Sequence, residues 1–380
     1  MDAEMASWKV KRPPGSPPVF KARYVARGFS QRQGVDFFQT FSPTPKMTTL
    51  RVLLHVAAHR DYELHSLDFS TAFLQGSLHE EIWLRRPLGF TGSFPAGTEW
   101  SLRRPVYGLR QAPCEWHDTL RTTLANLGFA PSTADPSLFL RTDTTLLPIY
   151  VLVYVDDLIF ATADTEALAH VKSELQKRHT CTDLGELTSY LGLRITRDRA
   201  ERTITLTQSH MVQQVLQSFG FTYSSPQSTP LPTGHSLSAP PSDESYIGHG
   251  ARVVLTGHAD ASWVDDLATQ RLSQGYTFSL GSCSVSRRST RSSSVLISSC
   301  EAEIYAGAMA AQELRWLTYL LTDLGEAPRS PPFLYVDNKA TLALCQEHKL
   351  EHRTKHIALC YFLARELQQR GQLRLAYVAS

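Results

Sequence analysis

The sequence lacks the features of several specialised protein classes. No apolar run approaches the roughly 18 residues of a membrane-spanning helix, so we expect no membrane partner. Residues 1–18 are basic and interrupted by prolines, so we expect no secretory signal peptide there. The six cysteines include no CxxC pair, and we expect free, mostly buried thiols in a reducing, intracellular compartment. The formal net charge is only +2, so any affinity for nucleic acid must come from local basic clusters.

One basic cluster lies near the N-terminus. Between Lys9 and Arg32 the chain has seven Lys or Arg residues and no acid. Residues 21–29 alternate basic and apolar side chains, which predicts a strand with one cationic face. A solvated edge strand that carries charge against aggregation has the same pattern, so both interpretations stay open.

The composition is that of a folded chain with more than one domain. Apolar residues make up 42% and charged residues 19% of 380 residues, a length that suggests about two or three domains. Residues 224–250 hold five prolines among many Ser, Thr and Gly, which is typical of a linker. We therefore expect a basic extension at 1–20, one domain at 21–223, a linker at 224–250 and a second domain at 251–380.

Two adjacent acids, Asp156 and Asp157, interrupt a strongly apolar stretch. Residues 149–155 predict a buried strand, and residues 158–161 predict the strand that returns beside it. Because Asp is common in tight turns, the pair is also explained as an ordinary hairpin turn. Carboxylates between two core strands nevertheless need a counter-charge or a metal ion, and oxygen ligands suit magnesium or manganese.

A metal site at this hairpin needs a third carboxylate, and Asp68 is the candidate. It follows a short apolar strand, and taken singly it is more simply explained as a helix N-cap. Helices are predicted at 48–59, at 165–178 after the N-cap Asp164, and from Ser209 to a stop at Gly220. In the last of these helices four side chains are expected to face inward: Val212, Val215, Leu216 and Phe219. Residues 187–195 predict a strand with a tight turn.

The second half of the chain predicts an α/β domain. Strands are expected at 253–259, ending in Asp260, at 275–280, and at 333–336, ending in Asp337. Residues 301–321 are rich in alanine and predict a helix that carries Glu303. The three acids could converge at one end of the sheet and hold a pair of metal ions, although each alone is compatible with an unrelated surface acid.

Taken together, these motifs resemble the reverse transcriptase and ribonuclease H of copia-type LTR retrotransposon Pol polyproteins. The resemblance covers nearly the whole chain from about Lys21. In the first half it rests on these motifs, in order: Lys21-Ala22-Arg23, Val25-Ala26-Arg27-Gly28-Phe29, Thr40-Phe41-Ser42-Pro43, Leu67-Asp68, Thr71-Ala72-Phe73-Leu74-Gln75-Gly76, Tyr107-Gly108-Leu109-Arg110-Gln111-Ala112-Pro113, Tyr154-Val155-Asp156-Asp157 and Leu191-Gly192. In the second half it rests on Asp260-Ala261-Ser262-Trp263, Ser298-Ser299-Cys300-Glu301-Ala302-Glu303, Val336-Asp337-Asn338 and Thr354-Lys355-His356-Ile357.

The resemblance implies an α+β fold, with reverse-transcriptase fingers and palm followed by an α/β ribonuclease H-like domain. It implies polymerase carboxylates at Asp68, Asp156 and Asp157, which with the backbone carbonyl of Phe69 would hold two Mg²⁺ or Mn²⁺ ions for nucleotidyl transfer. Phe73 would exclude a ribose 2′-hydroxyl. The other substrate-binding residues that it implies are Lys21, Arg23 and Arg27 at the triphosphate, Tyr107, Gly108 and Gln111 at the nucleotide and template, and Leu191 and Gly192 at the primer grip.

In the second domain the resemblance implies two further metal ions on Asp260, Glu303 and Asp337, for hydrolysis of RNA in a hybrid. Glu301 is a rival to Glu303, which better fits the family's usual pattern. The implied partners are an RNA template, a DNA primer, the RNA–DNA hybrid, deoxynucleoside triphosphates and other proteins of the element. The implied location is intracellular, in cytoplasmic particles or the nucleus.

Three departures from the family pattern bear on activity. Ala358 stands where the fourth ribonuclease H carboxylate is expected, so we expect that activity to be impaired. A Thr-Arg-Pro-Asp motif and the segment around it are missing, which suggests that the thumb and connection are deleted. Cys114-Glu115 replaces the usual Arg and small residue. The alternatives to an active polymerase are an inactive nucleic-acid-binding remnant and, with no positive feature to support it, a domesticated structural or regulatory protein.

Overall fold

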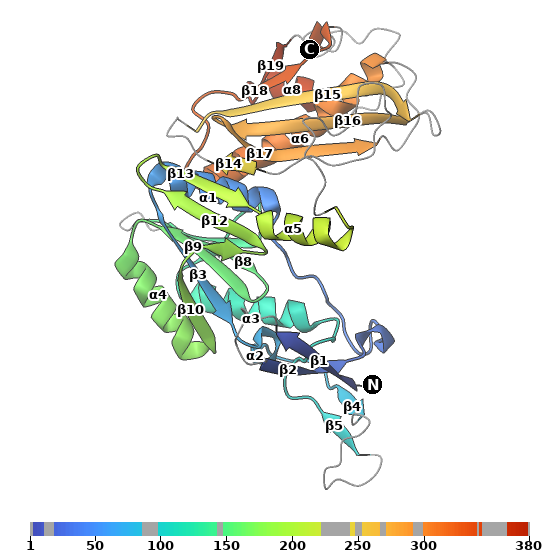
Figure 1. The fold of residues 1–380 in the computed structure, drawn as a ribbon, viewed down its shortest axis with the longest axis vertical. Coiled ribbons are helices and arrows are strands. Elements are labelled where there is room, and N and C mark those ends of the chain that lie inside the picture. The colour runs from blue at the N-terminus through green and yellow to red at the C-terminus, as the bar shows by residue number, and fades with distance from the viewer. Residues whose placement is uncertain are drawn as a thin grey trace. The chain divides into compact units, whose positions relative to one another are not determined.

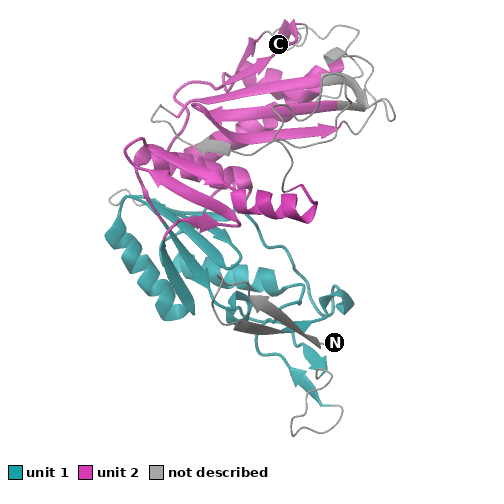
Figure 2. Ribbon diagram, viewed as in Figure 1, with its two compact units in different colours: residues 1–45, 65–131, 136–185 teal, residues 46–64, 132–135, 186–380 magenta. Residues whose placement is uncertain are grey.

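The structure is a computed structural model that describes residues 3–10, 19–85, 98–142, 147–221, 244–247, 253–266, 271–291, 299–339, 342–343 and 363–378. The chain divides into two compact units, which Figure 2 colours separately. Unit 1 comprises residues 1–45, 65–131 and 136–185, and unit 2 comprises residues 46–64, 132–135 and 186–380. No helix among the described residues is long and apolar enough to cross a membrane.

A six-stranded sheet forms the core of unit 1 (Figure 1). Its strand order is β10-β3-β9-β8-β7-β6, so strands distant in the sequence become neighbours. The strands are β3 (Glu63–Phe69), β6 (Ala130–Pro131), β7 (Leu138–Arg141), β8 (Ile149–Tyr154), β9 (Asp157–Thr162) and β10 (Cys181–Glu186). The central pair β8 and β9 is almost wholly buried because its side chains are apolar on both faces.

Helices and short strands complete unit 1. Helix α3 (Ala112–Asn126) and helix α4 (Thr165–Arg178) bury apolar side chains in the same core as the sheet, among them Trp116, Leu120 and Val171. Asp164 caps α4 by accepting the backbone N–H of Ala167 at 2.9 Å, as predicted. The remaining elements are β1 (Ala3–Val10), β2 (Val19–Ala26), the 3₁₀ turn η1 (Gly28–Ser30), α2 (Ala72–Gln75), β4 (Trp83–Arg85) and β5 (Glu99–Ser101).

Unit 2 contains two sheets. The first has the order β11-β12-β13-β14, formed by β11 (Ser189–Tyr190), β12 (Leu193–Asp198), β13 (Thr203–Thr207) and β14 (Glu244–Ile247). Helix α1 (Met47–Arg60) lies against β13 and β14 and is buried nearly all round. Helix α5 (Ser209–Ser218) belongs to the same unit.

The second sheet of unit 2 is mixed and five-stranded, with the order β17-β16-β15-β18-β19. Strands β15 (Leu255–Asp266), β16 (Arg271–Leu280) and β17 (Cys283–Arg291) form an antiparallel meander. Strands β18 (Phe333–Val336) and β19 (Arg374–Tyr377) add in parallel. The long helix α6 (Ser299–Asp323) packs on β15 and β16 through its alanines and leucines, and α8 (Leu363–Gln369) packs on α6.

The mixed helices and sheets confirm the predicted α+β class, but three local expectations are wrong. Asp68 lies within β3 and is not a helix N-cap. Strand β15 continues six residues past Asp260, because the β15–β16 pairing extends to Asp266 and Arg271. The apolar side chains of α5 are exposed, since no residue of that helix is buried. The predicted linker 224–250, apart from β14, and residues 354–358 lie outside the described residues.

Candidate active sites

The acidic pair of unit 1 lies at the end of a tight hairpin. Strands β8 and β9 pair up to Tyr154 and Asp157, which leaves Val155 and Asp156 as the two turn residues. Val155 has a φ of 55°, a left-handed conformation that is costly for a β-branched residue. The turn is therefore strained, and the surrounding contacts have to hold it in place.

Strand β3 brings Asp68 to this turn. It is the neighbour of β9 in the sheet, and the backbone N–H of Phe69 donates to the carbonyl of Asp156 at 2.8 Å. The pKa of Asp157 is raised to about 6, first by burial and then by the negative charges of Asp156 and Asp68. The structure thus brings all three predicted palm carboxylates into one negative field, where a divalent cation would relieve their repulsion.

Two aromatic residues of the predicted nucleotide pocket touch each other. The rings of Phe73, on α2, and Tyr107 lie 4.9 Å apart at 58°, and both side chains are half-buried. They come from segments more than 30 residues apart, and Phe73 packs against both apolar clusters of unit 1. The two rings therefore form one aromatic surface built from two separate segments.

The loop that carries Gly108 lies directly on the end of β2 and on Gly28, which begins η1. The backbone N–H of Ala26 donates to the carbonyl of Tyr107 at 2.7 Å. A Cβ atom on Gly28 would stand 2.0 Å from the carbonyl oxygen of Gly108, and one on Gly108 would stand 2.1 Å from that of Ala26. Gly108 also has a φ of +91°. Both positions therefore require glycine, because two backbones touch there.

The side chain of Gln111 lies in a buried position, which does not suit direct contact with a template. Its side chain is 0% exposed. Its amide accepts from Gln31 Nε2 at 2.9 Å and donates to the backbone carbonyl of Asp36 at 2.9 Å. Gln31 in turn accepts from the backbone N–H of Arg110 at 2.8 Å. These bonds favour a role for Gln111 in joining two loops over direct contact with a template.

The predicted triphosphate ligands are only partly described. Lys21 and Arg23 lie on the backbone of β2, and their side chains are outside the described residues. Arg27 follows β2 and is half-exposed next to η1. Arg110 also faces this region, since its Nε donates to the carbonyl of Gly28 at 2.8 Å. Glu115, the unusual acid, lies 3.5 Å from His79, and burial raises its pKa.

The predicted primer-grip residues form a tight turn in unit 2. Leu191 and Gly192 join β11 to β12 and have φ values of 48° and 81°. A two-residue hairpin turn with positive φ at both positions matches the natural twist of the strands. Leu191 is 43% exposed, so its side chain is available to a ligand.

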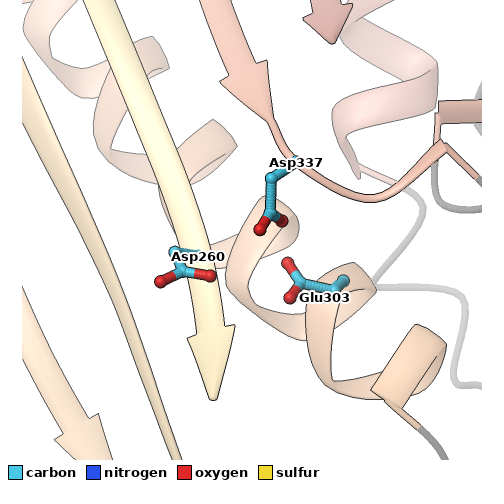
Figure 3. Close-up of side chains that lie close together, drawn as sticks. All are labelled: Asp260, Glu303 and Asp337. Carbon is cyan, nitrogen blue, oxygen red and sulfur yellow. The ribbon is translucent and has the colours of Figure 1, made fainter. Parts of the chain in front are cut away.

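Three carboxylates converge in unit 2. The ligand atoms of Asp260 on β15, Glu303 on α6 and Asp337 after β18 all lie within 4.8 Å of one another, as Figure 3 shows. They come from three separate elements and point toward a common centre. Among the described residues, these three acids form the group whose ligand atoms lie this close together. The carboxylates of Asp68, Asp156 and Asp157 are more widely spaced.

The electrostatics of this group favour a bound cation. Glu303 is only 6% exposed, and its pKa is raised to about 7 by burial and by the charges of Asp337 and Asp260. Its Oε1 accepts the backbone N–H of Ala261 at 3.3 Å, whereas its Oε2 has no hydrogen-bond partner among the described residues. Glu301 is also buried but is not part of the group, which favours Glu303 over its rival.

Comparison with known proteins identifies the first part of the chain. Residues 8–233 match the family model "Reverse transcriptase (RNA-dependent DNA polymerase)", which is more than half of the sequence. The chain belongs to this reverse transcriptase family. Asp68, Asp156 and Asp157 lie inside the matched region, whereas the acids of unit 2 lie beyond it.

Relatives of this chain confirm the resemblance to copia-type Pol polyproteins. The chain is 32% identical over 424 aligned residues to "Retrovirus-related Pol polyprotein from transposon RE2" of Arabidopsis thaliana, covering 96% of this chain and 29% of that protein. It is 28% identical over 427 residues to the Pol polyprotein from transposon TNT 1-94 of Nicotiana tabacum, covering 95% and 32%. The chain thus spans less than a third of the length of these relatives.

Solved structures similar to the reverse transcriptase chain are distant. An RNase H1 from Halobacterium salinarum NRC-1 is 14% identical with a TM-score of 0.24, covering 33% of this chain and 85% of that chain. A foamy viral protease-reverse transcriptase in complex with double-stranded DNA is 11% identical with a TM-score of 0.25, covering 99% of this chain and 65% of that chain.

The sequence did not indicate two residues that hold the predicted site, Trp116 and Gln31. Trp116 donates its indole N–H to the carbonyl of Val155 at 2.6 Å, and Gln31 bonds to Gln111. A Trp followed four residues later by Leu120 predicts only a buried helix face. No local pattern distinguishes a tryptophan that merely fills a core from one that bonds to a distant turn.

Proposed function

We propose that the chain is an RNA-directed DNA polymerase of a copia-type retrotransposon, which extends a DNA primer on an RNA template with deoxynucleoside triphosphates. The observation that carries this proposal is that Asp68 on β3 lies beside the β8–β9 turn that carries Asp156 and Asp157, inside the reverse transcriptase match. Its relatives are Pol polyproteins of transposons, which supports an intracellular site of action in cytoplasmic particles or the nucleus.

The residues of the palm fit a pair of Mg²⁺ or Mn²⁺ ions. The donors are carboxylate oxygens, together with the backbone carbonyl of Phe69, and hard divalent cations prefer such ligands. When bound, the ions would activate the primer 3′-hydroxyl and stabilise the leaving pyrophosphate. Asp156 and Asp157 would hold the ions from the turn, and Asp68 would hold them from the neighbouring strand.

The chain's own side chains would orient the nucleotide. Phe73, braced by Tyr107, would stand against the sugar and select deoxyribose. Lys21, Arg23 and Arg27 would lie at the triphosphate, and the backbone of Gly108 would allow close approach of the base pair. Gln111 would hold the loop that carries Gly108, and Leu191 with Gly192 would contact the primer.

We propose a ribonuclease H-like function for residues 251–380, with Asp260, Glu303 and Asp337 as ligands of two metal ions. The compact acid group and the orphaned Oε2 of Glu303 support this assignment. Ala358 offers no carboxylate, so hydrolysis of RNA in a hybrid would be weak. The basic extension would comprise residues 1–20. The fingers and palm would comprise residues 21–223, and the linker would comprise residues 224–250.

The thumb and connection are proposed to be shortened. The alignment with the Arabidopsis relative spans 424 positions, more than the 380 residues of this chain, so the relative has residues without a counterpart here. Fewer phosphate contacts along the duplex would lower processivity. The same loss, with Ala358, favours the second candidate function, that of an inactive nucleic-acid-binding remnant.

Primer extension on an RNA template with Mg²⁺ tests the proposal, with Asp156→Asn as the matched control. We expect short extension products from the wild type and none from the variant, because the variant loses a ligand charge. A folded wild-type chain that binds an RNA–DNA hybrid but yields no product would favour the remnant.

A further inference from the structure

The turn that carries the palm acids is held by two hydrogen bonds to its carbonyl groups. The indole Nε1 of Trp116 donates to the carbonyl of Val155 at 2.6 Å. The backbone N–H of Phe69 donates to the carbonyl of the next residue, Asp156, at 2.8 Å. The two donors come from α3 and β3, so both turn peptides are fixed by elements outside the hairpin.

The turn needs such fixing because its conformation is unfavourable. Val155 adopts a φ of 55°, which a β-branched residue avoids in a free hairpin. A residue in this region persists only where the surrounding structure over-determines it. The orientation of the Val155–Asp156 peptide also decides where the carboxylate of Asp156 points, since the two share one backbone unit.

Trp116 is itself held rigidly. Its side chain is 1% exposed, and its ring lies edge-on to Phe69 at 4.9 Å and to the imidazole of His179 at 5.5 Å. His179 lies 5.6 Å from Phe69 and is fixed in turn by a 2.9 Å contact between its Nε2 and the hydroxyl of Thr123. A buried indole in contact with two other rings and bonded through its N–H has little freedom to reorient, so this donor can define the turn.

We propose that Trp116 is a positioning residue of the palm site: its indole N–H holds the strained Val155–Asp156 peptide so that the carboxylates are preorganised for divalent cations. The inference rests on the proposed polymerase site and assigns to Trp116 a role beyond core packing. Partners that orient metal ligands typically change metal affinity by about tenfold or more when removed.

Metal binding tests the role without relying on polymerase activity. The parent is the full chain with Asp260→Asn and Glu303→Gln, which removes two of the three carboxylates of the acid group in unit 2. Mn²⁺ alone is titrated by calorimetry. Adding Asp157→Asn identifies the binding that belongs to the palm. Trp116→Phe in the same parent removes the N–H and keeps an aromatic ring.

Two control variants separate the hydrogen bond from other effects. Trp316→Phe removes the same kind of bond elsewhere, because the indole of Trp316 donates to the carbonyl of Ala134 at 2.8 Å. Leu120→Ala removes buried packing from α3 without touching the turn, since Leu120 is 0% exposed in the same core cluster. If Trp116→Phe fails to fold, replacing Trp116 by benzothienylalanine keeps the ring shape and removes only the N–H.

We expect Trp116→Phe to weaken palm Mn²⁺ binding by about tenfold, with both controls unchanged. Equal affinity in Trp116→Phe and its parent would overturn the inference, as would an equal loss in Leu120→Ala, or a parent whose binding is insensitive to Asp157→Asn. Primer extension by the wild type is measured separately. An inactive wild type that still shows the Trp116 effect would reject the polymerase proposal and keep the positioning role.

Discussion

The backbone N–H of Phe69 donates to the carbonyl of Asp156 across 2.8 Å, and this bond joins two segments almost 90 residues apart. It places the strand that ends in Asp68 and Phe69 beside the turn of Asp156 and Asp157. Asp68 therefore lies near the two acids of the turn because the backbones are hydrogen-bonded, not because the acids attract one another. Burial, and after it the negative charges of Asp156 and Asp68, raises the pKa of Asp157 to about 6.

The acid group of unit 2 should make stability depend on pH. The pKa of Glu303 rises from its ordinary 4.5 to about 7 in the folded chain, so folding takes up a proton between these pH values. The contribution of Glu303 to stability is fully present below about pH 4.5 and is lost as the pH rises through about 7. Glu303→Gln should therefore stabilise the chain at pH 8, without divalent cations, by about 1–3 kcal/mol, and by little at pH 5.

Denaturant unfolding at both pH values, in the presence of a chelator, measures this difference. Glu301→Gln is the matched control, because Glu301 is equally buried on the same helix but lies outside the acid group. Adding Mg²⁺ at pH 8 should raise the stability of the wild type more than that of Glu303→Gln. A pH-independent gain, or the same gain from Glu301→Gln, would contradict the assignment.

Gly108→Ala should destabilise unit 1 strongly. An alanine at a φ of +91° is strained by about 1–2 kcal/mol, and its Cβ would meet the carbonyl of Ala26 at 2.1 Å. We expect a total loss of about 3 kcal/mol or more in the free energy of unfolding. Gly185→Ala isolates the conformational cost, because at a φ of +73° its Cβ meets no atom within 4 Å among the described residues. Equal losses from the two variants in urea denaturation would show that the backbones do not touch at Gly108.

Arg288→Ala should weaken binding to an RNA–DNA hybrid. Arg287 and Arg288 line a hollow of about 610 Å³ that also contains Asp260, so a phosphate backbone near the acid group would meet these cations. We expect the affinity to fall several-fold and the slope of log affinity against log salt to decrease by about one. Binding measured by fluorescence anisotropy at several salt concentrations gives both numbers.

Arg291→Ala is the control for this experiment. Arg291 is exposed on the same strand, β17, but does not line the hollow. Non-specific attraction to basic residues would make the two variants alike, and that result would argue against a backbone-binding surface beside Asp260.

Sequence patterns predicted the elements that depend only on residues close to them in the chain. The β8–β9 hairpin, the N-cap of α4 and strand β18 each follow from runs of apolar residues and a flanking polar residue. The pairing of β3 with β9 does not follow from such local runs, because the partner of a strand is set by the whole sheet. For the same reason the contact between Trp116 and Val155 could not be foreseen.

Helix α5 shows where periodicity misleads. Its apolar side chains recur at helical spacing and predict a buried face, but burial also requires a surface to cover that face. Two valines show the difference. Val215 on α5 is 47% exposed, whereas Val171 on α4 is 0% exposed. The spacing of apolar residues shows which face of a helix is apolar. It does not show whether another element packs against that face.

Replacing these two valines by alanine should therefore have different effects. Val171→Ala removes fully buried methyl groups and leaves a cavity in the core of unit 1, so we expect a loss of about 2 kcal/mol. Val215→Ala removes methyl groups that already contact water, and helix propensity favours alanine, so the change should stay within about 0.5 kcal/mol. Chemical denaturation of both variants measures the difference. A loss at Val215 as large as that at Val171 would mean that the apolar face of α5 is covered in solution.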